Sequence, residues 1–480
     1  MSARLLMFLL GRGLLFMGAA LCVPLLAYML SPDGEPLAFA VPAGLAFSGG
    51  LLLSWQHPHK VRLGVREGAL LMLLAWLLLA FIGMLPYVIE GSMGWLDAAF
   101  ESISNFTTTG ASCATEPLTP PLLLWRSITE CVGGLIGMVL LVTVMPQVSG
   151  CFGISFSTHQ SISLSPMLNR MRRTGGHIAG VYAGLTVAAV LLYRLSGLGW
   201  FDALNWGMIT LSTSGCYETS QALMAHSLPL EMAAIVGMLF ASGNFFLYWS
   251  SVKRRSLRSL FANMELRTCL AVMLGCGLLV SLHLWYMQVY DWTDSFRYGF
   301  FQVVSFASTT GFEAVSINDW PDFDKYILFL LAFTGGCIGS TTGGFKVLRI
   351  IILFRAAFAE MRRTLHPRMI VHISVDGIFI PMEIVIDILG FFFLYLMIFL
   401  LFVLLIAFSG TTLLNAMGIA AACINSMGSA AVLYGTANDF AALPAFTKFI
   451  CCFLMILGKV EIFSFLLVLQ SGVRRLHQRW

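Results

Sequence analysis

The sequence predicts an all-α polytopic membrane protein, with two N-terminal helices followed by four pseudo-symmetric helix, re-entrant loop, helix repeats around one axis. Three observations predict this fold class. The 480 residues are 58% hydrophobic and 11% charged, whereas a soluble domain is about 25% charged. Many apolar segments reach the roughly 20 residues that a helix needs to cross a membrane. A short polar phrase centred on glycine occurs four times, as TTTGAS, STSGCY, STTGF and NSMGSA.

The N-terminal segment from Arg4 to Leu30 has the basic start and long apolar run of a signal peptide. However, Arg12 interrupts the run, no A-x-A cleavage site follows, and a second apolar segment begins at once. We therefore interpret it as a membrane helix. The second helix should end near Trp55, and we assign the pair to residues 1–60.

Four consecutive blocks follow, each with an apolar helix, a half-length helix, the glycine phrase and another apolar helix. The first helices should start near Gly68, His177, Thr268 and Pro381, and the last helices near Leu122, Leu228, Lys325 and Leu443. We assign the repeats to residues 61–170, 171–262, 263–375 and 376–480. Internal repeats in a membrane chain indicate a pseudo-symmetric assembly around an axis.

The half-length helices have their own signature. WLDAAF, WFDALN and WTDSF each place Trp, which favours the membrane interface, before an Asp that is expected to cap the helix. In the fourth copy Thr411 is the expected cap. Asp97 and Asp202 lie 13 residues before the glycine of their phrase, and Asp294 and Thr411 lie 17 before theirs. Such segments are too short or barely long enough to span, so each should be a re-entrant loop that lines a path.

Charged residues indicate the topology, because Lys and Arg concentrate in cytoplasmic loops. Most of the 28 basic residues fall into groups at the two ends and between the repeats. Both termini are therefore expected in the cytoplasm. Acidic residues cluster between the basic groups, where an outer face rich in carboxylates would concentrate cations. The same pattern is compatible with external loops that merely need to stay hydrated.

The composition of the glycine phrases suits the coordination of a cation. A re-entrant half-helix directs the partly negative end of its dipole at mid-membrane. Glycine permits backbone conformations in which consecutive carbonyls face one axis, and Thr and Ser can add hydroxyl oxygens. Four such loops would form rings of oxygens that replace the water around a monovalent cation. A single phrase could be an ordinary turn, but four copies in equivalent positions favour the ring.

Several longer motifs reveal a family resemblance. They are WRSITECVGGLIG (Trp125 to Gly137), ASGNFFLYW (Ala241 to Trp249), GGCIGSTTGGFKVLR (Gly335 to Arg349) and LGKVEIF (Leu457 to Phe463), together with the four glycine phrases. Over about residues 60 to 475 the chain resembles the TrkH/TrkG branch of the Trk, Ktr and HKT potassium transporter superfamily. Its two leading helices resemble the extra N-terminal pair of that branch.

The resemblance implies a selectivity filter around one pore, with potassium bound mainly by backbone carbonyls and no other metal site. The filter residues it implies are Thr108, Thr109, Gly110, Thr213, Ser214, Gly215, Thr309, Thr310, Gly311, Ser426, Met427 and Gly428. In the superfamily, serine at the first filter glycine accompanies sodium transport, so four glycines favour potassium. The fourth loop lacks the GPG string common in this branch, and no loop has the full TVGYG of potassium channels.

The last helix of the third repeat should be interrupted. The run TGGCIGSTTGGF contains Gly335, Gly336, Gly339, Gly343 and Gly344. Each glycine costs a helix interior up to about 1 kcal/mol relative to Ala, so this run is expected to unwind next to a cavity below the filter. By resemblance it is the intramembrane loop that gates the pore. A glycine-rich helix-packing surface is the alternative.

Lys459 lies near the middle of the last spanning helix, where a charge must face water or a partner. We interpret it as facing the pore below the filter, as an electrostatic barrier; its family counterpart is usually Arg. A lysine that extends toward the cytoplasmic side is the alternative. Glu461 should point elsewhere and pair with another group. Arg126 and Glu130, at i and i+4, are interpreted mainly as a structural ion pair.

Nothing in the sequence indicates an enzyme. It has no HExxH, P-loop or GxSxG motif, and the carboxylate pair Glu383 and Asp387 is interpreted as interfacial rather than catalytic. The eleven cysteines lack CxxC spacing and are interpreted as small buried hydrophobes. His57 and His59 have no third ligand nearby, which favours a loop over a metal site. A secondary transporter with broken helices, coupled to cations or protons, is the alternative function.

The resemblance also implies partners and location. It implies a homodimer in the inner membrane of a bacterium, with one pore per protomer. The chain has no nucleotide-binding motif and calls for no cofactor. Nucleotide sensing (ATP/ADP or NAD) would belong to a cytosolic RCK-type, TrkA-like ring that docks on the basic loops. Channel-like flux and proton-coupled symport both fit the residues, and no nucleic acid is expected.

Overall fold

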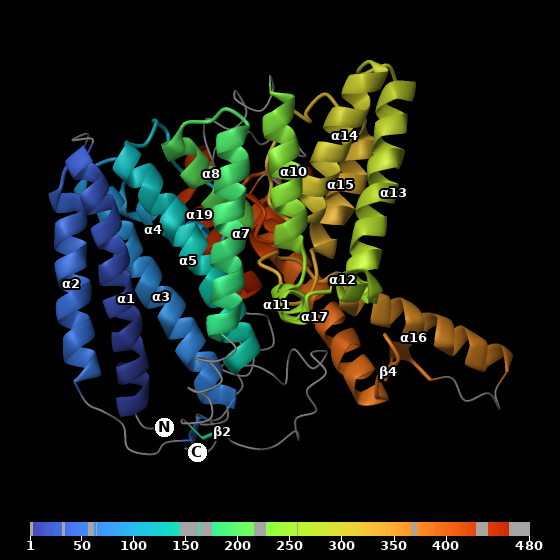
Figure 1. The fold of residues 1–480 in the computed structure, drawn as a ribbon, viewed down its shortest axis with the longest axis horizontal. Helices are drawn as coiled ribbons and strands as arrows, with labels where there is room; N and C mark the ends of the chain where they lie inside the picture. Colours follow the sequence, from blue (N-terminus) through green and yellow to red (C-terminus); the bar gives the residue numbers. More distant parts are fainter. Residues whose placement is uncertain are drawn as a thin grey trace.

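The protein is described here from a computed structural model. The structure describes residues 3–30, 34–55, 62–63, 65–144, 162–163, 175–215, 227–256, 258–366, 372–428 and 440–459. These residues are almost entirely helical, and most helices run roughly parallel through one slab (Figure 1). The predicted all-α polytopic fold is confirmed.

Two leading helices stand at one edge of the slab (Figure 1). Helix α1 (Ala3–Leu30) packs along α2 (Leu37–Ser54), and both contact the first repeat. Buried side chains such as Leu21 and Phe39 belong to a core shared with the first repeat, whereas Leu26 and Leu52 on other faces are largely exposed. Apolar side chains exposed along a helix of this length match a lipid environment.

The repeats follow the predicted order. Their first helices are α3 (Val65–Ile89), α7 (Gly176–Leu195), α13 (Met264–Tyr286) and α17 (Met382–Phe408). Their half-length helices are α4 (Trp95–Phe106), α8 (Trp200–Ser212), α14 (Trp292–Ala307) and α18 (Leu413–Ile424). Their last helices begin with α5 (Pro120–Val144), α10 (Leu228–Ser242), α15 (Asp322–Thr334) and α19 (Ala445–Lys459). The helix starts agree with the predicted starts to within a few residues, while the division of the chain between repeats stays a prediction.

Further helical elements lie between these helices. They are α11 (Phe245–Arg254), α12 (Arg258–Ala262), α16 (Val347–Leu365) and the 3-10 turn η3 (Phe440–Ala442). Two small antiparallel pairs are also present: β1 (Arg62–Leu63) pairs with β2 (Ile162–Ser163), and β3 (Ser374–Val375) with β4 (Ile378–Phe379). Helix α16 projects away from the slab at the end opposite α1 and α2 (Figure 1).

Six of the described helices are long and apolar enough to cross a membrane, or seven if the bent pair α10 and α11 counts as one span. That pair bends by 91° at Gly243. The last helix of the third repeat is also broken, because α15 ends at Thr334 and α16 begins at Val347. The helix interruption predicted over the glycine-rich run is therefore present, and a second break occurs in the repeat before it.

The predicted helix caps were wrong. Helices α4 and α8 begin after Gly94 and Gly199, so Asp97 and Asp202 lie in the first turn and not at the cap position. Asp294 lies in the same way in the first turn of α14. Thr412, not Thr411, caps α18 by accepting from the Asn415 amide at 3.4 Å. The prediction failed because acidic residues also favour the first turn through the helix dipole alone, without capping geometry.

Candidate functional site

Each half-length helix ends in the same unusual turn. The second residue of each glycine phrase has a left-handed backbone, with φ of 52° at Thr108, 57° at Thr213, 52° at Thr309 and 52° at Ser426. Left-handed conformations are uncommon outside glycine and rarer still for β-branched residues. Four occurrences in equivalent positions therefore indicate a backbone held in place by its surroundings.

The phrase glycines extend this pattern in the first three loops. Gly110, Gly215 and Gly311 have φ of 77°, 69° and 82°, and the residue between the two left-handed positions in each loop has a negative φ. Alternation of this kind lets successive carbonyl oxygens face one side of the chain. Gly428 in the fourth loop does not share the positive φ. The backbone of the fourth loop therefore differs from that of the other three at this glycine.

The loops meet through their backbones. The Gly428 amide donates to the Thr109 carbonyl at 2.5 Å, which joins the fourth loop to the first. A Cβ on Gly215 would lie 1.7 Å from the Thr310 carbonyl oxygen, so the second and third loops touch where only glycine fits. The sequence-predicted filter residues are therefore brought into contact in two pairs of loops, the first with the fourth and the second with the third. All of them are buried except Gly110 and Gly215, which are half-buried.

Hydroxyl pairs brace three of the loops. Thr107 with Thr109, and Ser308 with Thr310, pair at 2.8 Å between side-chain oxygens, and Ser212 with Ser214 at 3.3 Å. These bonds join residues two apart, across the left-handed residue. In the fourth loop a different contact replaces the pair, since Tyr395 of α17 donates its hydroxyl to the Asn425 side chain.

The non-helical segment between α15 and α16, residues 335–346, lies in the helix break of the third repeat; we call it the intramembrane loop. It is held by the corner between α10 and α11: the Cys337 amide donates to Ser242 O at 2.8 Å, and the Phe245 amide donates to Gly339 O at 3.2 Å. The Ile338 amide donates to the Glu265 carboxylate of α13 at 2.6 Å. The two helix breaks are therefore docked on each other.

The intramembrane loop also contacts the glycine loops. The Gly343 amide donates to the Thr309 hydroxyl at 2.8 Å, and a Cβ on Gly343 would lie 1.8 Å from Asn425 O. Lys459 of α19 donates to the Thr108 hydroxyl at 2.6 Å and to Thr341 O at 3.4 Å. The intramembrane loop thus contacts the glycine loops of the third and fourth repeats directly. It is linked to the glycine loop of the first repeat through Lys459.

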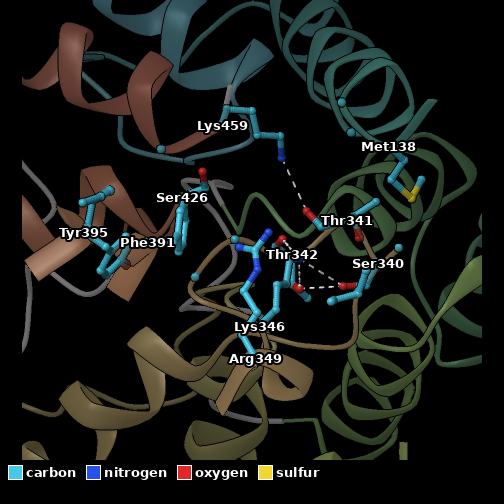
Figure 2. A pocket seen from close by; sticks show the side chains of 18 residues that line it. Met138, Ser340, Thr341, Thr342, Lys346, Arg349, Phe391, Tyr395, Ser426 and Lys459 are labelled. Atoms are coloured by element: carbon cyan, nitrogen blue, oxygen red, sulfur yellow. Dashed lines mark hydrogen bonds between the residues drawn. The ribbon is translucent and has the colours of Figure 1, made fainter. Parts of the chain in front are cut away.

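A cavity of about 70 Å³ lies between these groups. Gly134 and Gly137 of α5, the intramembrane loop, Ser426 and Lys459 line it, and Lys459 extends across it toward Thr341 (Figure 2). Two more basic side chains line the same cavity. Lys346 donates to Thr342 Oγ1 at 2.9 Å, and the Arg349 guanidinium stacks over the Phe391 ring at 4.5 Å. The space next to the left-handed turns is therefore narrow and electropositive.

The structure extends the interpretation of Arg126. The predicted ion pair with Glu130 is present at 3.9 Å, and Glu101 of α4 lies nearer to the guanidinium, at 2.9 Å. Sequence spacing could suggest only the i, i+4 partner, because Glu101 is 25 residues away in the chain. Glu101 and Glu130 are two of the polar residues near the loops that sequence reasoning did not assign to the site; Glu265, Lys346 and Arg349 are others.

Some predicted features are elsewhere or undescribed. Glu383 and Asp387 are exposed on α17, and no metal-binding cluster occurs among the described residues. His57, His59, Glu461 and the end of the LGKVEIF motif lie outside the described residues, as does the fourth loop after Gly428. Of the nine described cysteines, six are buried and Cys22, Cys131 and Cys276 are half-buried.

The fold and the site together define a multi-pass membrane protein whose re-entrant loops converge on a narrow polar centre. The TrkH family model, described as cation transport protein, matches residues 41–472. The chain belongs to this family, whose members are transport proteins rather than enzymes.

Its relatives extend along nearly the whole chain. It is 30% identical over 474 residues to the Trk system potassium uptake protein TrkH of Halomonas elongata, covering 97% of this chain and 98% of that protein. It is 32% identical to the Trk system potassium uptake protein TrkG of Escherichia coli, covering 87% and 88%. The crystal structure of the potassium transporter TrkH from Vibrio parahaemolyticus superimposes with a TM-score of 0.90 at 28% identity, covering 98% and 99%.

Proposed function

We propose that this chain mediates potassium uptake through a filter built by its four glycine loops. The observation that carries the proposal is the left-handed turn repeated at Thr108, Thr213, Thr309 and Ser426, because four equivalent turns can present rings of carbonyl oxygens to one axis. The relatives' names specify potassium uptake. The ion-facing groups are the carbonyls of each glycine and of the two residues before it, and glycine in all four positions favours potassium over sodium.

The test measures rubidium uptake into liposomes that contain the purified chain, with potassium or sodium as competitor. The wild-type protein should prefer potassium, and Gly110→Ser should lose most of that preference, because a side chain at a φ of 77° disturbs the carbonyl next to it. Gly184→Ser is the matched control, since a Cβ there meets nothing within 4 Å. If sodium and potassium inhibited rubidium uptake by the wild-type protein equally, the proposal of a potassium-selective filter would be wrong.

The gate proposed for this filter consists of the intramembrane loop, with Gly335, Gly336, Gly339, Gly343 and Gly344, and of Lys459. The contacts of Gly343 and Lys459 with Thr309 and Thr108 support it, since a loop that closes an ion path must lie against the filter. A fixed positive charge in the path adds a barrier to cations in a low-dielectric surrounding. The loop must withdraw, and Lys459 must turn aside, for an ion to pass.

Replacement of this lysine tests the gate. Lys459→Ala should raise basal rubidium uptake several-fold, because it removes the charge and both hydrogen bonds. Lys459→Arg, which keeps the charge, should stay near the wild-type rate. Unchanged uptake in Lys459→Ala, at equal protein content and melting temperature, would show that Lys459 has only a structural role.

The proposal includes an assembly. Two copies form a homodimer in the inner membrane of a bacterium, with both termini cytoplasmic, and a TrkA-like RCK ring docks on the basic loops and brings nucleotide sensing. The basic groups between the repeats support this orientation. Addition of such a ring with ATP, ADP or NAD to the liposomes should change the uptake rate. Indifference to all three nucleotides would exclude this form of control.

A further inference from the structure

A chain of buried polar side chains runs behind the first two glycine loops. It begins at Glu101 of α4, whose carboxylate accepts hydrogen bonds from the Ser112 hydroxyl at 3.1 Å and from the Cys113 amide at 2.9 Å. Both donors follow Gly110 in the chain. The carboxylate, which is fully buried, thus fixes the backbone that leaves the first loop.

Arg126 of α5 continues the chain. Its guanidinium lies 2.9 Å from Glu101 and 3.9 Å from Glu130, and all three side chains are at most 1% exposed. A buried guanidinium shared by two carboxylates is held in one place, because moving it would leave a charge in the protein interior without its partner. The triad is therefore a rigid support between α4 and α5.

The triad ends on the second loop. Glu130 Oε2 accepts a hydrogen bond of 2.6 Å from the hydroxyl of Ser214, the residue just before Gly215. The residues in the same position of the first and third loops, Thr109 and Thr310, pair at 2.8 Å with a hydroxyl of their own loop. In the second loop the corresponding contact, to Ser212, is longer at 3.3 Å. The strongest polar contact of Ser214 therefore comes from another repeat.

We infer that Glu130 is a positioning residue for the second loop: held by Arg126 and Glu101, it fixes Ser214 and thereby sets the preference of the filter for potassium. The inference rests on the filter proposed above. The contact of Ser214 with Glu130, at 2.6 Å, is shorter than its hydroxyl pair with Ser212, at 3.3 Å, so Glu130 can fix the Ser214 side chain where the hydroxyl pair is weak. It also couples the first repeat to the second, since Glu101 fixes one loop and Glu130 the other.

The experiment compares Ser214→Ala, Glu130→Ala, Glu130→Gln and the double variant Ser214→Ala/Glu130→Ala. For each, the potassium preference is the ratio of the sodium and potassium concentrations that halve rubidium uptake, measured with protein whose melting temperature has been checked. Glu231→Gln is the matched control, because Glu231 is also a buried carboxylate held by an arginine, but its partner Arg297 lies on α14 rather than in a glycine loop.

Ser214→Ala and Glu130→Ala should each lower the preference by roughly three- to tenfold, with the double variant no lower than the more affected single variant, because both remove one contact. Glu130→Gln should retain most of the preference, since its amide oxygen still accepts from Ser214. Glu231→Gln should leave it unchanged.

The inference about Glu130 would be overturned if folded Ser214→Ala kept the wild-type preference for potassium. It would also be overturned if the effects of the two single changes multiplied in the double variant. Neither result would contradict the proposed filter. If the wild-type protein showed no preference for potassium, the proposed filter itself would be wrong. Ser214→Ala removes a single oxygen, so it keeps the test decisive even if the Glu130 variants fail to fold.

Discussion

At the residue scale, the site contains backbone conformations that are energetically unfavourable for its residue types. Thr108, Thr213 and Thr309 are β-branched and left-handed, which costs about 1–2 kcal/mol for each residue. The compensation comes from hydroxyl pairs and from buried neighbours around each turn. Glycine occupies the position where no side chain would fit; at Gly215, for example, a Cβ would collide with the carbonyl oxygen of Thr310.

Substitution of Gly215 tests this packing. A methyl group in Gly215→Ala would meet Thr310 O at 1.7 Å and would also require a φ of 69° in a residue with a Cβ. We expect loss of rubidium uptake and destabilisation by at least about 1–2 kcal/mol, measured as a fall in melting temperature in detergent. Gly184→Ala, in open space on α7, should change neither quantity. Normal uptake by Gly215→Ala would contradict the close contact of these loops.

At the element scale, two broken helices are docked on each other. The corner of α10 and α11 holds Cys337 and Gly339 of the intramembrane loop through backbone hydrogen bonds. Asn244 stabilises this corner, because its side chain accepts from the amides of Phe246 and Leu247 at the start of α11. The intramembrane loop is therefore supported on one side by the corner and contacts the glycine loops on the other.

A side chain at Gly343 should shift the loop. In Gly343→Ala the added Cβ would lie 1.8 Å from Asn425 O, so the loop can no longer rest against the fourth glycine phrase. The expected result is a several-fold higher basal rubidium uptake, because the closed position is disfavoured. Gly180→Ala, where a Cβ meets nothing within 4 Å, serves as the control. Uptake at or below the wild-type rate would indicate that the loop does not close the path.

At the scale of the whole molecule, ion pairs join neighbouring repeats. Arg297 of α14 contacts Glu231 of α10 at 2.7 Å, which links the third repeat to the second. Lys448 of α19 contacts Asp97 of α4 at 2.5 Å, which links the fourth repeat to the first. The second pair joins residues about 350 positions apart in the sequence. It brings the last repeat against the first, so the four repeats form a closed ring within one chain.

Removal of one partner should loosen this ring. Arg297→Met leaves the buried Glu231 without its cation and should cost about 2–3 kcal/mol, less than a fully buried pair because Arg297 is partly exposed. The double variant Arg297→Met/Glu231→Met should recover part of the loss, since no buried charge remains. Thermal unfolding in detergent measures both. A double variant less stable than Arg297→Met would contradict this explanation.

The sequence by itself determined the fold class, the order of the helices, the position of the glycine loops and the break near Gly335. These features follow from local signals: apolar length fixes a spanning helix, and glycine composition fixes where one stops. Only the tertiary structure decided that Arg126 pairs with Glu101, that Ser214 is held by Glu130, and that the α10 corner supports the intramembrane loop. Those contacts join residues far apart in the chain, and hydrogen bonds between such residues depend on how the helices pack, which no spacing in the sequence specifies.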